Sequence, residues 1–128
     1  MRGIGLVLVG CVMIGHAGAA DPPARKFVVF FRQWSAALSA NAVKVIGHAG
    51  DFAKAHPGET VHVNAFADPT AGQKASELLT DLRAQVVMDQ LQKDGVPNTR
   101  VLGRGHGSVQ FALTPQESRR VEISVAGQ

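Results

Sequence analysis

The sequence predicts a single small α+β domain, an α/β sandwich in which two helices pack on a mixed β-sheet. Strand-like and helix-like segments follow one another in the order β-α-β-α-β-β. Each strand–helix–strand step favours parallel strands joined by a helix that covers the sheet. The chain has 128 residues, the length of one domain, so we expect one hydrophobic core.

Four segments have the composition of β-strands. Residues 26–31 (KFVVFF) form a continuous apolar run, which is typical of a strand covered on both faces. Residues 60–66 (TVHVNAF) and 121–125 (VEISV) alternate apolar and polar side chains, so one face of each strand should be buried. A shorter strand begins at residues 100–102.

A glycine-rich stretch, residues 103–107 (GRGHG), follows this short strand. It lacks the lysine and threonine that end a phosphate-binding loop, and no clear helix pattern comes after it. We therefore expect a turn at this stretch and a loop over residues 108–117.

Two helices are expected, over residues 35–55 and 71–93. The first should end before a His-Pro-Gly tripeptide, because the residue before a proline is displaced from the helical conformation. Thr70 and Gln73 have the spacing of a capping box at the start of the second helix. Gly95 follows this helix and favours its end.

The first twenty residues have the pattern of an export signal. Arg2 supplies a positive charge, residues 4–14 are apolar, and residues 17–20 are small, as a signal peptidase requires. The apolar run is shorter than the roughly 20 residues that span a bilayer. We expect residues 1–20 to be a signal peptide and residues 21–128 to form the exported domain.

Lipidation is the alternative for this segment. The tetrapeptide that ends in Cys11 (LVGC) resembles the lipobox of bacterial lipoproteins, whose cysteine carries a lipid anchor. Cleavage there would follow a very short signal and leave an apolar stub, which favours the signal peptide. Cys11 is also the single cysteine in the sequence, so we expect no intramolecular disulfide.

Composition argues against nucleic acid as a partner. Thirteen Lys and Arg residues oppose ten Asp and Glu residues, and this small excess is spread along the chain rather than clustered. Aromatic side chains that stack on bases are few, and tyrosine is absent from the sequence. The histidines lack metal-site spacing and no nucleophile–base pattern is recognisable, so we expect no cofactor and no enzymatic activity.

An arginine of the second helix lies close to the expected core face. That face is a narrow apolar arc formed by Ala75, Leu79, Leu82 and Val86. Arg83 falls beside the arc, and a charge held against apolar surface needs an anionic partner or a route to water. Asp68 is the expected partner, because it follows the second strand, where ligands of open α/β sheets collect.

Two interpretations of this pair are open. Asp68 and Arg83 either form an internal salt bridge that ties the loop to the helix, or present opposite charges to a zwitterionic ligand. Structural ion pairs are common, so the spacing by itself favours the salt bridge.

The residues around the pair resemble the signature of the OmpA-like C-terminal domain, which is shared by outer membrane protein A, the Pal lipoproteins and the MotB stators. Residues 65–87 (AFADPTAGQKASELLTDLRAQVV) align without a gap to GhTDxxGxxxYNxxLSxxRAxxV, with Asp68 on the aspartate and Arg83 on the arginine. Three more segments are similar to family motifs in the same order: 29–39 (VFFRQWSAALS), 95–107 (GVPNTRVLGRGHG) and 119–123 (RRVEI).

This resemblance implies non-covalent, non-catalytic binding of peptidoglycan in the periplasm of a Gram-negative bacterium, anchoring the protein to the cell wall. The pocket would hold the diaminopimelate of a stem peptide, with Asp68 taking its ammonium group and Arg83 the carboxylate on the same carbon. Ser76 and Thr80, at polar positions of the signature helix, are the further ligand-binding residues that it implies. Association with outer-membrane or other envelope proteins is a further expectation.

Several positions depart from the family pattern. The replaced positions are Ala67, Ala71, Ala75, Ser76 and the Arg32-Gln33-Trp34 stretch. We expect Trp34 to be a partly buried cap at the junction of the first strand and helix rather than a sugar-stacking residue. The alternative function is the same fold with a degenerate pocket, acting as a periplasmic protein-interaction module.

Overall fold

A computed structural model describes residues 25–70, 72–108 and 115–126. In these ranges the strands are β1 (Arg25–Phe30), β2 (Thr60–Ala67), β3 (Val101–Ser108) and β4 (Arg120–Ala126). The helices are α1 (Ala40–Ala55), α2 (Gln73–Lys93) and the short α3 (Pro115–Ser118), with a 3-10 turn, η1 (Asn98–Arg100). The predicted signal peptide and the lipobox cysteine Cys11 lie outside the described residues. None of the described helices is both long and apolar enough to cross a membrane.

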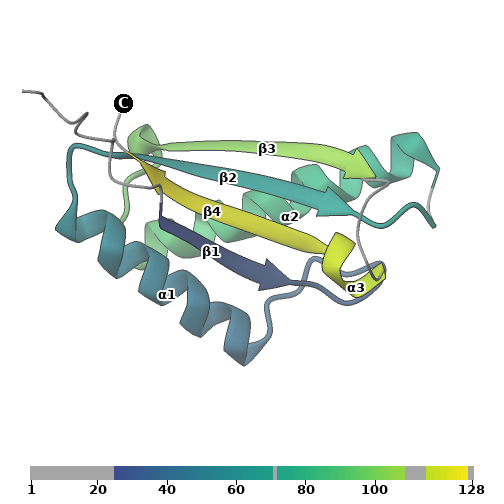
Figure 1. Cartoon of the computed structure of the whole chain (residues 1–128), viewed down its shortest axis with the longest axis horizontal. Helices are drawn as coiled ribbons and strands as arrows, with labels where there is room; N and C mark the ends of the chain where they lie inside the picture. Colours follow the sequence, from purple (N-terminus) through teal and green to yellow (C-terminus); the bar gives the residue numbers. More distant parts are fainter. Residues whose placement is uncertain (1–24, 71, 109–114, 127–128) are drawn as a thin grey trace, which may run out of the picture.

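The strands form one mixed sheet in the order β1-β4-β2-β3 (Figure 1). Strand β4 pairs antiparallel with both β1 and β2, whereas β2 and β3 are parallel. The carboxyl ends of β1, β2 and β3 therefore meet the start of β4 at one end of the sheet. The predicted mixed sheet with two packed helices is confirmed.

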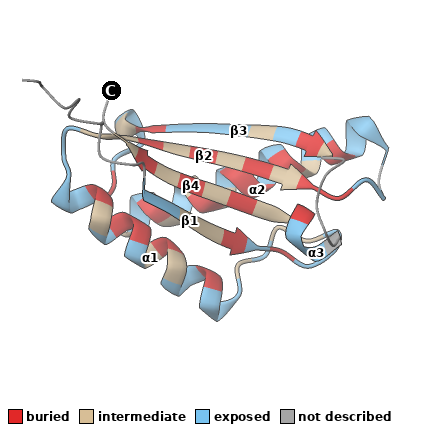
Figure 2. Ribbon diagram, in the orientation of Figure 1, coloured by how far each residue is buried: buried red, intermediate tan, exposed pale blue. Residues whose placement is uncertain are grey.

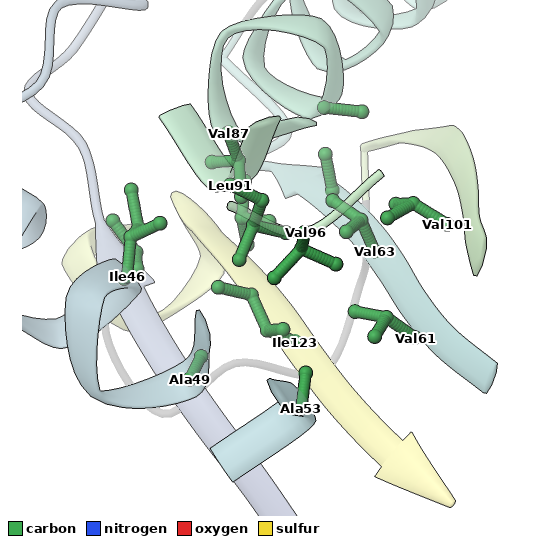
Figure 3. Packing of buried hydrophobic residues seen from close by; sticks show 14 of the residues in the cluster. Ile46, Ala49, Ala53, Val61, Val63, Val87, Leu91, Val96, Val101 and Ile123 are labelled. Carbon is green, nitrogen blue, oxygen red and sulfur yellow. The ribbon is translucent and has the colours of Figure 1, made fainter. Parts of the chain in front are cut away.

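One face of the sheet forms the core with α1 and α2. Strands β2 and β4 alternate buried and half-buried residues along their length (Figure 2). The close-up in Figure 3 shows side chains of both helices meeting those of the sheet: Ile46, Ala49, Ala53, Val61, Val63, Val87, Leu91 and Ile123. Burying each of the larger aliphatic side chains contributes about 1.5–3 kcal/mol, so this face provides most of the stabilisation.

The first helix begins later than the prediction of residue 35. It starts at Ala40, where the side chain of Ser39 accepts a hydrogen bond from the backbone N–H of Ala42 at 3.0 Å. Ser35 lies in a turn closed by its own backbone N–H, which donates to the carbonyl of Arg32 at 3.2 Å. The periodicity of this segment could not reveal the turn, because the turn is held by Arg83 of α2, which donates to the carbonyls of Arg32 and Ser35.

The second helix was predicted wrongly in its cap and its buried face. Gly72 is its N-cap and makes no side-chain capping bond, while Thr70 bonds Asp68 instead. Ala75 and Leu82 of the predicted arc are exposed and Val86 is only partly buried against the core, so the arc is not the buried face of the helix. The buried residues of α2 are Ser76, Thr80, Arg83, Ala84, Val87 and Leu91.

The glycine-rich stretch is part of strand β3, not the predicted turn. Gly103 and Gly105 lie under α2, and a Cβ added to Gly105 would come within 2.5 Å of the backbone nitrogen of Asp81. The absence of side chains lets the polar face of α2 approach the strand closely. Ser108 ends β3 and α3 occupies part of the predicted loop, whose residues 109–114 lie outside the described ranges.

Candidate ligand-binding site

Three chain segments meet beside α2 at the end of the sheet where β1 and β2 finish. They are the loop after β1, the residues after β2, and the residue that precedes β4. Together with α2 they form a small open pocket lined by Gln33, Trp34, Asp68, Thr70, Leu79, Arg83 and Arg119. The pocket contains one carboxylate and two guanidinium groups, so its floor carries a net positive charge at neutral pH.

Asp68 is a buried carboxylate at 4% exposure, and both of its oxygens accept hydrogen bonds. One oxygen accepts hydrogen bonds from the backbone N–H of Thr70, at 3.1 Å, and from the Thr70 hydroxyl. The other oxygen accepts from Nη1 of Arg119 at 3.0 Å. Burial by itself raises the pKa of Asp68, but the bonds from Thr70 and Arg119 outweigh it and hold the pKa below 3.8.

Arg83 is completely buried and bound to the backbone of the β1–α1 loop and of β2. Its Nε donates to the carbonyl of Ser35 at 2.8 Å, and its Nη2 donates to the carbonyl of Arg32 at 3.0 Å. A longer bond of 3.5 Å joins Nη1 to the carbonyl of Phe66. Burial lowers the pKa of Arg83 to about 10, against the opposing influence of Asp68, so the side chain remains charged at neutral pH.

The expected Asp68–Arg83 salt bridge is replaced by a different pair. Asp68 forms its ion pair with Arg119, and Arg83 binds carbonyl oxygens. The sequence reasoning missed Arg119 as a member of the site. In the sequence Arg119 appears only as the first residue of the RRVEI motif, and it is the antiparallel pairing of Phe66 with Arg120 that places it beside the end of β2.

Both arginines keep donors that could bind an anion. A guanidinium has five N–H groups. Among the bonds of the described residues, Arg83 uses three of its five, and Arg119 uses two, to Asp68 and to the carbonyl of Phe31. The side chain of Arg119 is 18% exposed, so it is the more accessible of the two cations.

Ser76 and Thr80 are completely buried on the face of α2 that is turned to the sheet, outside the pocket lining. The hydroxyl of Thr80 accepts a bond from the backbone N–H of Gly107 and donates to the carbonyl of Glu77, both at 3.0 Å. The hydroxyl of Ser76 has no hydrogen-bond partner among the described residues. The structure therefore brings Asp68 and Arg83 into one pocket, places Thr80 against β3, and leaves Ser76 outside the pocket lining.

Trp34 lies in the tight turn between β1 and α1, with its side chain 60% exposed at the rim of the pocket. The prediction of a partly buried cap is wrong, because Ser39 caps α1. Its backbone has a φ of 57°, a left-handed conformation that bulky residues seldom adopt.

A family model for the OmpA family matches residues 30–122, a range that includes every residue lining this pocket. The chain belongs to the OmpA family. The signature aspartate and arginine of the family fall on two of the charged groups just described. The OmpA-like family is known for association with peptidoglycan.

A curated relative supports this assignment. An outer membrane protein of Gluconacetobacter diazotrophicus is 34% identical over 118 residues, covering 81% of this chain and 31% of that protein. The chain thus spans about a third of the length of this relative.

Solved structures show the same fold at lower identity. The peptidoglycan-associated lipoprotein from Burkholderia pseudomallei has a TM-score of 0.71 at 16% identity, covering 77% of this chain and 89% of that one. The OmpA-like domain of FopA1 from Francisella tularensis has a TM-score of 0.72 at 22% identity, covering 80% and 71%. The C-terminal domain of Helicobacter pylori MotB has a TM-score of 0.69 at 23% identity, covering 81% and 85%.

Proposed function

We propose that this chain binds peptidoglycan non-covalently and without catalysis, in the periplasm, after export directed by residues 1–20. The observation that carries the proposal is the pocket in which Asp68 lies beside two arginines. A zwitterionic end group of a stem peptide, such as that of diaminopimelate, has the charges that this arrangement complements. Membership of the OmpA family supports the same ligand.

Each charged group has a distinct role in this proposal. Asp68 offers its remaining acceptor capacity to the ligand ammonium, and Arg119 and Arg83 offer their remaining N–H groups to the ligand carboxylate. Ser76 and Thr80 make no direct contact with the ligand in this proposal, because their side chains are buried outside the pocket lining. Two guanidinium groups against one carboxylate leave one positive charge, which favours the carboxylate of the ligand on the arginine side of the pocket.

The strength expected of one site is modest. Each charge-assisted contact contributes about 1.5–3 kcal/mol, and binding must offset the lost freedom of the ligand. Roughly micromolar to millimolar affinity for one stem peptide is therefore expected. Because the cell wall is a polymer, repeated contacts lengthen attachment well beyond that of one site.

Co-sedimentation with purified diaminopimelate-type peptidoglycan tests the proposal. We expect the wild-type protein to pellet with the wall, and Asp68→Asn and Arg119→Gln to bind about ten- to a hundred-fold more weakly, since each loses one charged contact. Arg83 is a poor choice for this test, because its loss would release the loops that it holds.

Arg104→Gln is the matched control, because Arg104 is an exposed arginine of β3 outside the pocket lining. Circular dichroism establishes that each variant is folded. A folded wild-type protein that stays in the supernatant would refute the proposal and favour a protein-interaction role. Equal binding by all three variants would place the wall-binding surface elsewhere.

A further inference from the structure

Trp34 is the part of the pocket rim that the proposed function leaves unused. It is the single tryptophan of the chain, it is 60% exposed, and it lines the same pocket as Asp68 and Arg83. Tryptophan is among the residues that most often provide binding energy at protein surfaces. A large ring exposed beside buried charges therefore points to contact with a ligand rather than to packing.

The backbone at this position is strained and held in place by the pocket itself. A φ of 57° is costly for a bulky residue and persists only where surrounding contacts enforce it. Arg83 supplies those contacts, because it donates to the carbonyls of Arg32 and Ser35, the two residues that begin and end the turn. The buried cation of the site thus fixes the turn that displays the indole.

The neighbouring residue connects the same turn to the carboxylate. The side-chain amide of Gln33 donates to the hydroxyl of Thr70 at 3.5 Å, and Thr70 in turn bonds Asp68. The turn that carries Trp34 is therefore bonded to both charged groups of the proposed site. Such preorganisation lowers the entropic cost of binding.

We propose that Trp34 is a stacking platform for a pyranose ring of the glycan strand, beside the pocket that holds the stem peptide. This inference rests on the proposed function. Leu79 provides apolar surface in the pocket lining, and Trp34 is the exposed aromatic side chain of that lining, so it is available to the part of the ligand beyond the charged end group. In peptidoglycan that part continues through glutamate and alanine to the sugar, whose flat apolar C–H face matches the face of an indole.

The test compares two probes that differ only in the sugar. One, the free tripeptide, is alanine–glutamate–diaminopimelate with its alanine nitrogen acetylated, and the other is the same tripeptide attached through that nitrogen to its N-acetylglucosamine–N-acetylmuramic acid disaccharide. Calorimetric titration of the full chain should show about tenfold tighter binding of the disaccharide form. Because Trp34 is the single tryptophan, its fluorescence should change with this probe and change little with the free tripeptide.

Two substitutions remove the ring with different effects on the backbone. Trp34→Ala and Trp34→Gly should each abolish the preference, so that within each variant the disaccharide form and the free tripeptide bind with equal affinity. Glycine tolerates the positive φ, so Trp34→Gly should melt at a higher temperature than Trp34→Ala. A shared loss of sugar preference in two variants of different stability cannot come from unfolding. Leu102→Ala, at an apolar side chain of β3 that is also 60% exposed, is the control that keeps the preference.

The outcomes separate this inference from the proposed function. Equal wild-type affinity for both probes, or a sugar preference that survives in both Trp34 variants, would overturn the stacking role and leave the peptide pocket intact. Failure of the wild-type protein to bind either probe would overturn the peptidoglycan function and the stacking role with it.

Discussion

Two hydroxyl groups on the buried face of α2 differ in what they bond. Thr80 accepts from the backbone N–H of Gly107, so it satisfies a buried donor of β3. Ser76, one turn earlier, is equally buried but has no hydrogen-bond partner among the residues that the structure describes. A buried polar group without a partner costs stability, whereas a bonded one is expensive to remove.

Removing each hydroxyl should therefore have unequal effects. We expect Thr80→Val to lower the free energy of unfolding by about 1–3 kcal/mol, because it strands the N–H of Gly107 without an acceptor. Ser76→Ala should leave stability unchanged or raise it by up to about 1 kcal/mol. Urea unfolding of both variants checks this pair. Similar losses in both would show that Ser76 has a partner that its described surroundings do not provide.

At the scale of elements, the contact between α2 and β3 depends on glycine. An added Cβ at Gly105 would lie 2.5 Å from the backbone nitrogen of Asp81 and 2.6 Å from Oγ1 of Thr80. At Gly103 the obstruction is the end of the Met88 side chain, which can change rotamer. Adding a methyl group at Gly103 should therefore cost little stability. At Gly105 it should cost more, because the backbone of the helix must move.

Three alanine substitutions test this packing. Gly105→Ala should destabilise the fold by about 1–3 kcal/mol or more, and Gly103→Ala by less. Gly47→Ala is the control: it lies in α1, an added Cβ there meets nothing within 4 Å, and helix propensity favours alanine by about 0.5–1 kcal/mol. Thermal unfolding should rank the variants in that order, and a neutral Gly105→Ala would contradict the close approach of α2.

At the scale of the whole molecule, the Asp68–Arg119 pair joins the end of β2 to the start of β4. The pKa of Asp68 in the folded protein lies below 3.8, so the folded state binds its proton less readily than the unfolded state. The stabilisation is therefore complete at pH values above the unfolded pKa and disappears as the pH falls through the folded pKa.

Acid unfolding should reveal this contribution. At pH 7 we expect the wild-type protein to be about 1–3 kcal/mol more stable than Asp68→Asn, since the variant has lost a charged acceptor of buried bonds. The difference should shrink as the pH falls below about 4 and vanish once Asp68 is protonated. Chemical denaturation at a series of pH values measures it. A difference that is independent of pH would mean that the carboxylate charge does not stabilise the fold.

Much of the fold was predictable because local patterns decide it. Alternation in residues 60–66 and 121–125 is a property of neighbouring side chains, and both segments are strands with the expected faces buried. The spacing of Asp68 and Arg83 was enough to place both in one site. These features depend on the periodicity of side chains and the spacing of residues along the chain, both of which can be read directly from the sequence.

The failures share a different physical origin. The buried face of α2, the strand at Gly103–Gly107 and the late start of α1 all depend on contacts between distant segments. The position of Arg83 in the sequence does not reveal that it will bind carbonyls of the β1–α1 loop. The glycines of β3 likewise do not reveal that a polar face of α2 will pack closely on the strand. Hydrophobic periodicity identifies the apolar face of a helix or strand. It gives no information about buried polar side chains, which here are stabilised by hydrogen-bond partners on distant segments.

The sequence by itself determined the α+β class, the succession of strands and helices along the chain, and the two signature charges of the OmpA family. The tertiary structure decided the partners of those charges: Arg119 for Asp68 and loop carbonyls for Arg83. It also placed Trp34 at the rim of the pocket rather than at a helix cap. The physical reason is that pattern and propensity act between near neighbours, whereas hydrogen bonds and ion pairs depend on which distant segments the folded sheet brings together.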